Sequence, residues 1–230
     1  MKLFYDLHIH SALSPCGDGD MTPNNIVNMS AIKGLDFIAV TDHNSVLNLP
    51  AVIECAKDLP VIIVPGMEIE TSEEVHMLSL FPSVDDAYNV YEEIKKNRLG
   101  VKNRPDIFGQ QVIMDSNDEI IGYEEELLVT ATKLSLEKTK EIIEANNGVA
   151  IPAHIDRNSY SVLSNLGVIP EIGFKTVELS KKADLNKYTN LEYKTVINSD
   201  AHYLEDIFEP ENFLDLEEKS LNCLISHLKG

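Results

Sequence analysis

Histidines with a shared sequence setting are the residues of this chain that most clearly carry chemistry. Of its seven histidines, six border short apolar runs: His8, His10, His43, His76, His154 and His202. Five of these six lie at or just after the end of a run, whereas His76 lies at the start of "VHMLSLF". Imidazole nitrogens are ligands for Zn, Mn and Fe, so the set indicates a metal site. The seventh, His227, is expected in the last turn of a helix, where it favours the helix dipole.

Acidic residues accompany these histidines. Four carboxylates lie close to them in the sequence: Asp18, Asp42, Glu68 and Asp200. His8 and His10 are two residues apart on an expected strand, so both side chains point to one face. In a β/α barrel the carboxyl ends of the strands converge, which would bring the scattered residues together. The alternative, a set of unrelated helix caps and core histidines, does not explain the shared placement.

Apolar runs alternate with helical stretches along the chain. The runs cover Leu3–Ile9, Leu35–Val40, Val61–Met67, Val75–Phe81, Val149–Ala153, Thr176–Leu179 and Thr195–Ile197. Helix signals lie between them, such as the Thr22-Pro23 start and the Gly34 stop. This alternation predicts an α/β fold with a parallel sheet, and about seven units predict a barrel.

The segment from Arg98 to Lys133 departs from the alternation, because it is longer than an ordinary connection. It contains "QQVIMDSNDEIIGYEEELLV", which predicts a hairpin around residues 116–118. We therefore expect a single domain over residues 1–230, with an insertion at about 98–133. Two roles stay open for the insertion: a lid near the site, or a surface decoration.

The composition limits the classes of function. Hydrophobic residues make up 43% of the chain, which is enough for a sizeable core. The formal net charge of −19 predicts repulsion of a phosphate backbone, so long nucleic acid is not an expected partner. Three cysteines without a Cys-x-x-Cys pair argue against a disulfide framework or a zinc ribbon. The sequence contains neither a signal peptide nor a membrane-spanning run, so we expect a cytoplasmic protein; the oligomeric state stays open.

Taken together, the motifs resemble those of the PHP family, named for polymerase and histidinol phosphatase. The resemblance rests on five motifs in family order: His8-Ile9-His10, Thr41-Asp42-His43, Glu68 with His76, "PAHIDR" at His154, and Ser199-Asp200-Ala201-His202. It covers most of the chain. The resemblance implies a single PHP domain with a distorted (β/α)7 barrel and a centre of three divalent ions, Zn, Mn or Fe.

The resemblance also implies which residues hold each ion. The first ion is assigned to His8, His10, Glu68 and Asp200. Glu68 bridges to a second ion, which is held also by His76 and His154. The third is assigned to His43, His202 and an acidic residue of the opening loop. The family register gives Asp18 for that residue, with Asp20 or Cys16 as alternatives because the loop holds extra residues; a bystander thiol is the favoured interpretation of Cys16.

Such a centre implies phosphoester hydrolysis without a covalent intermediate. A hydroxide that bridges two ions would attack phosphorus, and a residual charge of about +2 would match a phosphomonoester dianion. We therefore expect a metal-dependent phosphoesterase whose partner is a small phosphomonoester or nucleotide. Glu68 and Asp42 are the expected catalytic residues, with Asp42 supporting a ligand imidazole, carrying a proton or making a plain strand-end hydrogen bond. Arg157 and Lys181 are expected to bind the substrate phosphate.

Three other functions stay open. An exonuclease or oligonucleotide phosphatase would use the same site, although 19 basic against 38 acidic residues disfavour binding of long strands. An amidohydrolase-type C–N hydrolase would use similar metals, but such enzymes often carry a bridging carbamylated Lys where this chain has Glu68. A metal-binding module without catalysis would be expected to have lost ligands, and none is obviously missing.

Overall fold

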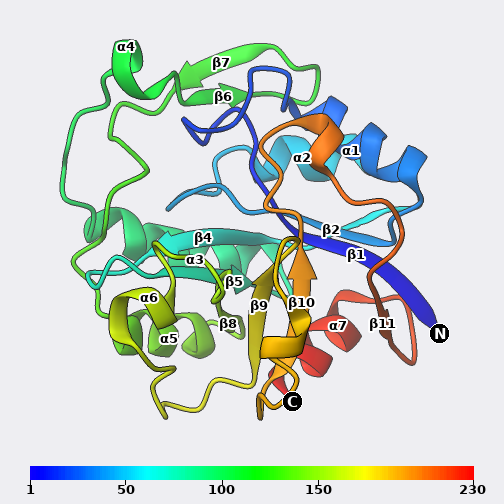
Figure 1. Ribbon diagram of the computed structural model, residues 1–230. Helices are drawn as coiled ribbons and strands as arrows, with labels where there is room; N and C mark the ends of the chain where they lie inside the picture. Colours follow the sequence, from blue (N-terminus) through cyan, green and yellow to red (C-terminus); the bar gives the residue numbers. More distant parts are fainter.

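Strands and helices alternate along the chain in the computed structural model, which describes all residues 1–230 (Figure 1). The strands are β1 (Lys2–Ile9), β2 (Phe37–Val40), β3 (Ile62–Ile63), β4 (Gly66–Glu70), β5 (His76–Leu80), β6 (Val112–Met114), β7 (Ile120–Tyr123), β8 (Val149–Pro152), β9 (Thr176–Ser180), β10 (Lys194–Asn198) and β11 (Phe213–Asp215). The α-helices are α1 (Pro23–Lys33), α2 (Leu49–Cys55), α3 (Val84–Lys96), α4 (Pro105–Phe108), α5 (Leu136–Ala145), α6 (Val162–Leu166) and α7 (Leu221–Lys229). Two short 3₁₀ helices are η1 (Leu185–Lys187) and η2 (Leu204–Asp206). Every predicted apolar run contains a strand.

Helix ends lie where side chains and glycine satisfy the free backbone groups. At the start of α1, the Thr22 hydroxyl accepts a hydrogen bond from the Asn25 N–H, and Gly34 ends the helix with a φ of 79°. The predicted start and stop of this helix are therefore confirmed. None of the helices combines the length and the apolar composition that a membrane crossing needs.

The regular strand ladders form four sheets. The orders are β11-β1-β2-β3, β4-β5-β8, β10-β9 and β6-β7. The mixed α/β fold is confirmed, and the expected parallel pairing holds for β1-β2, β2-β3 and β9-β10, but β5 runs antiparallel to both β4 and β8. Only residues 71–75 separate β4 from β5, which is too short for a crossover helix, so β5 returns as a hairpin.

Backbone hydrogen bonds nevertheless join strand ends that belong to different elements. Three of them lie around one place in the molecule: His10 N–H to the Ala201 carbonyl at 2.9 Å, Asn44 N–H to the Glu68 carbonyl at 2.8 Å, and Ile155 N–H to the Glu178 carbonyl at 2.9 Å. These bonds link the end of β1 to that of β10, the end of β2 to β4, and the end of β8 to β9. The result is a converging set of strand ends, and the histidines lie on it.

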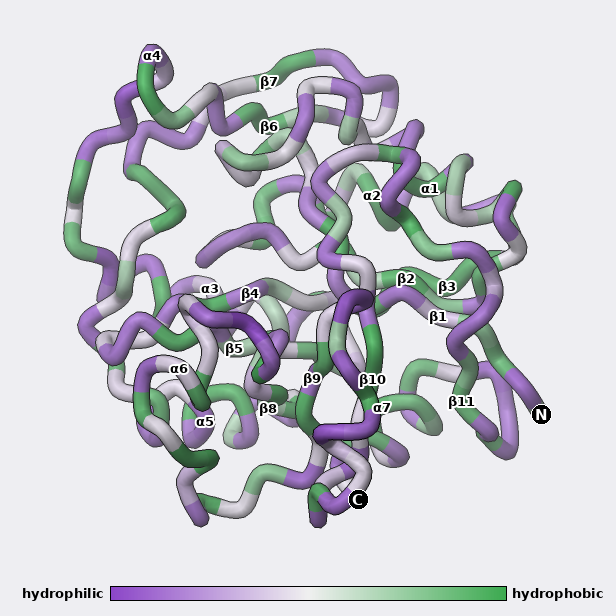
Figure 2. The backbone as a smooth tube through the Cα atoms, viewed as in Figure 1, coloured by the Kyte–Doolittle hydropathy of each residue, from purple (hydrophilic) through white to green (hydrophobic).

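Apolar packing on both sides of the strands holds this arrangement. The larger core contains Ile26 of α1, Val52 of α2, Val90 of α3 and Ile143 of α5, packed against the strands. A second core contains Leu224 of α7 and apolar residues of β1 and β10. Figure 2 shows hydrophobic stretches along the central strands and mostly hydrophilic connecting loops. Burial of these faces fixes the strand ends on which the site depends.

The predicted hairpin of the long insertion is present as β6 and β7, which pair antiparallel at the top of Figure 1. Backbone bonds attach it to the first loop of the chain: the Val112 N–H donates to the Ala12 carbonyl at 2.9 Å. The Asn48 amide donates to the Val112 carbonyl at 3.1 Å. The insertion is thus packed against the loop that follows His8 and His10.

Candidate metal centre

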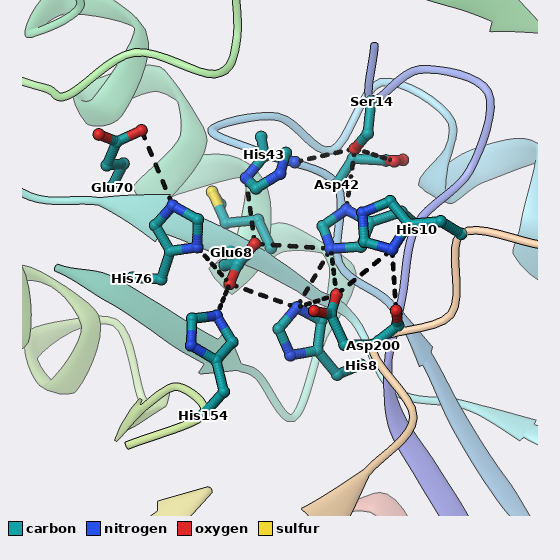
Figure 3. A network of polar contacts seen from close by, with 12 residues as sticks. His8, His10, Ser14, Asp42, His43, Glu68, Glu70, His76, His154 and Asp200 are labelled. Atoms are coloured by element: carbon teal, nitrogen blue, oxygen red, sulfur yellow. Dashed lines mark hydrogen bonds and ion pairs between the residues drawn. The ribbon is translucent and has the colours of Figure 1, made fainter. Parts of the chain in front are cut away.

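The Glu68 carboxylate lies at the centre of the histidine cluster (Figure 3). It is almost fully buried on β4, and both of its oxygens face imidazole nitrogens. The distances from Oε1 are 2.8 Å to His76 Nδ1, 3.1 Å to His154 Nε2 and 3.4 Å to His8 Nε2; those from Oε2 are 3.0 Å to His43 Nδ1 and 3.5 Å to His10 Nε2. The two oxygens thus face different sets of histidines, as a bridging carboxylate would.

The position of His76, which did not follow the strand-end pattern, has a simple cause. Because β5 is antiparallel to β4, its first residue pairs with the last residue of β4, Glu70. The start of β5 therefore lies at the same end of the sheet as the other strand ends. His76 reaches Glu68 from there.

Asp200 and His202 complete the far side of the cluster. Asp200 Oδ1 lies 3.0 Å from His10 Nε2 and 3.4 Å from His8 Nε2. The His202 ring stacks on His10, with ring centroids 4.5 Å apart. The structure therefore gathers eight of the nine residues expected to bind metal: His8, His10, His43, Glu68, His76, His154, Asp200 and His202.

Asp18 is the expected ligand that does not join the cluster. One of its carboxylate oxygens accepts a hydrogen bond from the Asp20 N–H at 2.9 Å, on the exposed side of the opening loop. Cys16 lies closer to the centre. Its sulfur and one nitrogen each of His10, His43 and His202 all lie within 4.8 Å of one another.

Hydrogen bonds outside the cluster fix which nitrogen of two imidazoles points inward. His8 Nδ1 lies 2.9 Å from the Glu178 carboxylate, and His202 Nδ1 lies 2.8 Å from the Asp200 carbonyl. Carboxylate and carbonyl oxygens accept, so both Nδ1 atoms carry the proton. The neutral form of each ring therefore presents an unprotonated Nε2 to the cluster, which is the form that binds metal.

Asp42 acts on the cluster through Ser14. The Ser14 hydroxyl donates to Asp42 Oδ1 at 2.7 Å, so it accepts from His10 Nδ1 at 3.0 Å. Asp42 also accepts from the Ser11 N–H and hydroxyl, at 2.8 and 2.6 Å. Burial raises the pKa of Asp42, and these hydroxyls oppose that rise. Among the expected roles of Asp42, this geometry corresponds to the support of a ligand imidazole.

The donor atoms of the cluster fit divalent cations. His8 Nε2 and His10 Nε2 lie 3.2 Å apart, and in the neutral rings the outer hydrogen bonds place the proton on Nδ1, so both Nε2 atoms are free to bind a cation. Three further buried atoms of the cluster make no hydrogen bond, although each lies within 3.0 Å of Glu68 or His10: His43 Nδ1, His76 Nδ1 and Asp200 Oδ1. Buried polar atoms are ordinarily paired, and cations between these groups would satisfy them. Imidazole and carboxylate donors suit Zn, Mn or Fe.

The acidic groups of the cluster are ionised. Burial opposes the charge on Glu68, but the His76 and His8 imidazoles hold its pKa well below the ordinary value. Burial likewise opposes the charge on Asp200, and His8 with His10 holds its pKa well below the usual range. Both carboxylates are therefore available as ligands at neutral pH.

Backbone strain occurs at two of the clustered residues. His154 and Asp200 have positive φ angles of 29° and 50°, in the left-handed region that non-glycine residues rarely adopt. The Glu178 carboxylate accepts the His154 N–H at 2.8 Å and so holds that turn in place. Such strain costs about 1–3 kcal/mol per residue and persists mainly at functional sites.

The cluster forms the floor of a cavity of about 220 Å³, whose wall includes Val129 of the insertion and the ring of Tyr160. A polar groove of about 670 Å³, with no hydrophobic lining residue, adjoins it. Arg157 and Asp200 line both spaces, and Arg157 Nη2 lies 2.5 Å from Asp200 Oδ2. Lys181 lies in the groove, paired with Asp206, away from the histidines.

Three residues that support or border the site were not predicted from the sequence: Ser14, Tyr160 and Glu178. Glu178 orients His8 and also accepts from the Asn198 amide at 2.7 Å. Ser14 relays Asp42 to His10, and Tyr160 stacks on His76 with ring centroids 4.9 Å apart. Only Glu178 carried a usable signal, since it is the one acid within the apolar run of β9.

Comparison with known proteins identifies the family. The family model described as the PHP domain matches residues 6–205, which is most of the chain. The chain belongs to the PHP domain family. This confirms the family and the class of hydrolase that its motifs predicted, and it supports a requirement for divalent metals. The PHP fold is a distorted barrel; in this chain, strand-end bonds between β1 and β10, β2 and β4, and β8 and β9 join three of the four sheets.

Individual relatives of this PHP chain are hydrolases of phosphoric esters. This chain is 32% identical over 83 residues to a 5'-3' exoribonuclease of Salmonella typhimurium; the match covers 34% of this chain and 27% of the relative. This chain is also 34% identical over 80 residues to phosphoribosyl 1,2-cyclic phosphate 1,2-diphosphodiesterase of Eggerthella lenta; the match covers 33% of this chain and 29% of the relative. The chain thus spans less than a third of either relative. Endonuclease Q, solved with a 27-mer duplex substrate, shares the fold with a TM-score of 0.71 at 19% identity, covering all of this chain and 57% of that one.

These comparisons overturn one expectation from the sequence. A small phosphomonoester or nucleotide was the expected partner, and long nucleic acid was disfavoured by the net charge of −19. That expectation is contradicted: one relative is an exoribonuclease, and endonuclease Q, which shares the fold, was solved with a 27-mer duplex substrate. Net charge sums the whole surface, whereas a phosphate is bound by the few groups around one cavity.

Proposed function

We propose that this PHP domain is a metal-dependent nuclease that hydrolyses phosphodiester bonds of a nucleic-acid strand. The observation that carries the proposal is the small cavity with its histidine and carboxylate floor, which continues into an open polar groove. A cavity of about 220 Å³ is smaller than most small-molecule sites. It admits a phosphate group and leaves the rest of a strand to the groove.

Divalent ions would be held by His8, His10, His76, His154, Glu68 and Asp200. When bound, such ions supply Lewis-acid stabilisation of the phosphate and lower the pKa of water. The chain supplies the positioning of these ligands: Glu178 fixes the tautomer of His8, and Asp42 with Ser14 fixes that of His10. Glu68, facing histidines with both oxygens, holds the two halves of the centre together.

Substrate contacts would come from the rim of the cavity. The Arg157 side chain is 42% exposed, and its guanidinium can bind a non-bridging phosphate oxygen with the geometry that phosphate favours. Tyr160 is 47% exposed, and its ring beside His76 offers a face on which a base can stack. Lys181 and Lys182 line the groove, where the next phosphates of the strand would lie.

Single-stranded RNA and DNA oligonucleotides, labelled at either end and incubated with Zn²⁺, Mn²⁺ or Fe²⁺, test the proposal. We expect metal-dependent cleavage, and the order of labelled products distinguishes removal of end nucleotides from internal cuts. The Glu68→Gln variant should lose activity on the order of a thousandfold, because the ligand charge at the centre is lost. Glu141→Gln, an exposed residue on α5, is the matched control and should cleave normally. No cleavage of any strand with any of these ions would refute the proposal.

A further inference from the structure

The loop between β1 and α1 folds back on itself and carries Cys16 to the side of His202. The Gly17 N–H donates to the Ser14 carbonyl at 2.9 Å, which closes a turn around Cys16. The Asp18 N–H then donates to the His202 carbonyl at 2.9 Å. Backbone bonds on both sides of the thiol therefore fix its position against the cluster.

A second observation at this position points to a ligand. The His43 side chain is only 8% exposed, and its Nδ1 makes no hydrogen bond, although Glu68 Oε2 lies 3.0 Å away. The bond from His202 Nδ1 to the Asp200 carbonyl places the proton of the neutral ring on Nδ1 and leaves Nε2 free to bind a cation. The Cys16 sulfur joins one nitrogen of each of these rings and of His10 within 4.8 Å.

We propose that the Cys16 thiolate is a metal ligand that completes a site with His43 and His202. The inference rests on the metal centre of the proposed function and does not depend on its substrate. Neither acid of the loop competes for the position. Asp18 and Asp20 belong to none of the groups of close donor atoms, and Asp18 bonds the Asp20 N–H instead.

The choice of sulfur has a chemical consequence. A thiolate carries the same single negative charge as a carboxylate, so the charge balance of the centre is unchanged. Thiolates are softer ligands, however, and favour Zn²⁺ over Mn²⁺ or Mg²⁺. We therefore expect this position to select Zn²⁺, even where the carboxylate-rich part of the centre accepts harder ions.

Cobalt substitution tests the Cys16 ligand directly. We expect the Co²⁺-loaded full chain to show the near-ultraviolet absorption of thiolate-to-cobalt charge transfer. The absorption should be lost in Cys16→Ser and in Cys16→Asp. Cys16→Asp should keep the metal content of the native chain, since a carboxylate replaces the thiolate. Cys55→Ser and Cys223→Ser, whose thiols lie on α2 and α7, are the matched controls and should keep the absorption.

Alkylation of the native chain provides a test that needs no variant. Cys16 is exposed, so iodoacetamide should label it readily after chelation. Zn²⁺ should protect it, because a metal-bound thiolate is a weaker nucleophile, while labelling of Cys55 and Cys223 should change little. Peptide mass spectrometry reads each site separately.

The outcomes separate this inference from the nuclease proposal. Absence of the cobalt absorption in the native chain, its survival in Cys16→Ser, or equal labelling of Cys16 with and without Zn²⁺ would each overturn the Cys16 ligand. Absorption and protection without cleavage of any oligonucleotide would leave the ligand in place and refute the nuclease alone. Neither readout uses a substrate.

Discussion

Single side chains outside the cluster determine the state of the ligands inside it. Glu178 shows this most clearly, since it accepts from His8 Nδ1, from the His154 N–H and from the Asn198 amide. One buried carboxylate thus sets the tautomer of one ligand and the backbone of another. Mutation of a group that orients a metal ligand commonly lowers metal affinity or activity by about 10–100-fold.

Replacement of Glu178 by Gln should therefore weaken metal binding without removing any ligand. The amide can donate to His8 Nδ1, which would place the proton on the inward Nε2. We expect metal affinity to fall by about 10–100-fold, measured by competition with a chromogenic chelator. The exposed Glu137→Gln on α5 is a suitable control. Equal affinities of Glu178→Gln and the native chain would show that Glu178 does not orient His8.

At the scale of elements, the opening loop depends on one close approach. A Cβ on Gly17 would lie 2.4 Å from the Ser11 carbonyl oxygen, a distance that real Cβ atoms essentially never show. The same loop carries Ser14 and Cys16 and contacts the insertion. Its conformation therefore decides where several groups of the site lie.

Gly17→Ala should move this loop and with it the thiol of Cys16. We expect the free energy of unfolding to fall by about 1–3 kcal/mol, the usual cost of forced overpacking, in a urea titration. Gly19→Ala is the matched control two residues away, because no atom lies within 4 Å of the position that its methyl group would take. A stability of Gly17→Ala equal to that of Gly19→Ala would contradict the close packing of the loop.

At the scale of the whole molecule, strong negative charge surrounds a site for phosphates. The net charge of −19 opposes binding of a strand, which leaves the metal centre and the few basic groups beside it to provide the attraction. Strand binding should thus require the metal centre, unlike binding by a basic surface.

Removal of the metals should accordingly abolish binding and not only cleavage. With a chelator present, we expect the affinity for a non-hydrolysable oligonucleotide to fall by at least about tenfold, measured by fluorescence anisotropy. Glu68→Gln should behave as the chelated protein does, and Glu141→Gln as the metal-loaded one. Unchanged binding in chelator would place strand recognition outside the centre.

Strand β1 also links stability to pH through Tyr5. Its hydroxyl accepts the Ile197 N–H of β10 at 3.2 Å, and burial raises its pKa to about 12. The unfolded chain has a tyrosine pKa near 10, so the fold favours the neutral phenol. This stabilisation is complete below about pH 10 and is lost as pH rises from about 10 to 12.

The native chain should therefore lose about 3 kcal/mol relative to Tyr5→Phe between about pH 10 and pH 12, because phenylalanine does not ionise. Chemical unfolding of both proteins across this range measures the difference. Tyr123→Phe on β7, where the side chain is 51% exposed, should follow the native chain throughout. Parallel pH profiles for Tyr5→Phe and the native chain would contradict the burial argument.

Local signals in the sequence were enough to predict most of the strands, the helix from Thr22 to Gly34 and the histidines of the cluster. These signals are apolar runs, caps, and histidines with carboxylates placed at run ends. The reversed direction of β5, which explains His76, and the roles of Glu178 and Ser14 emerged only from the folded chain. The same holds for Cys16, which faces the cluster in place of Asp18. Each of these features depends on contacts between residues far apart in the chain or on the path of one loop. Such contacts and loop paths leave no local period or motif in the sequence.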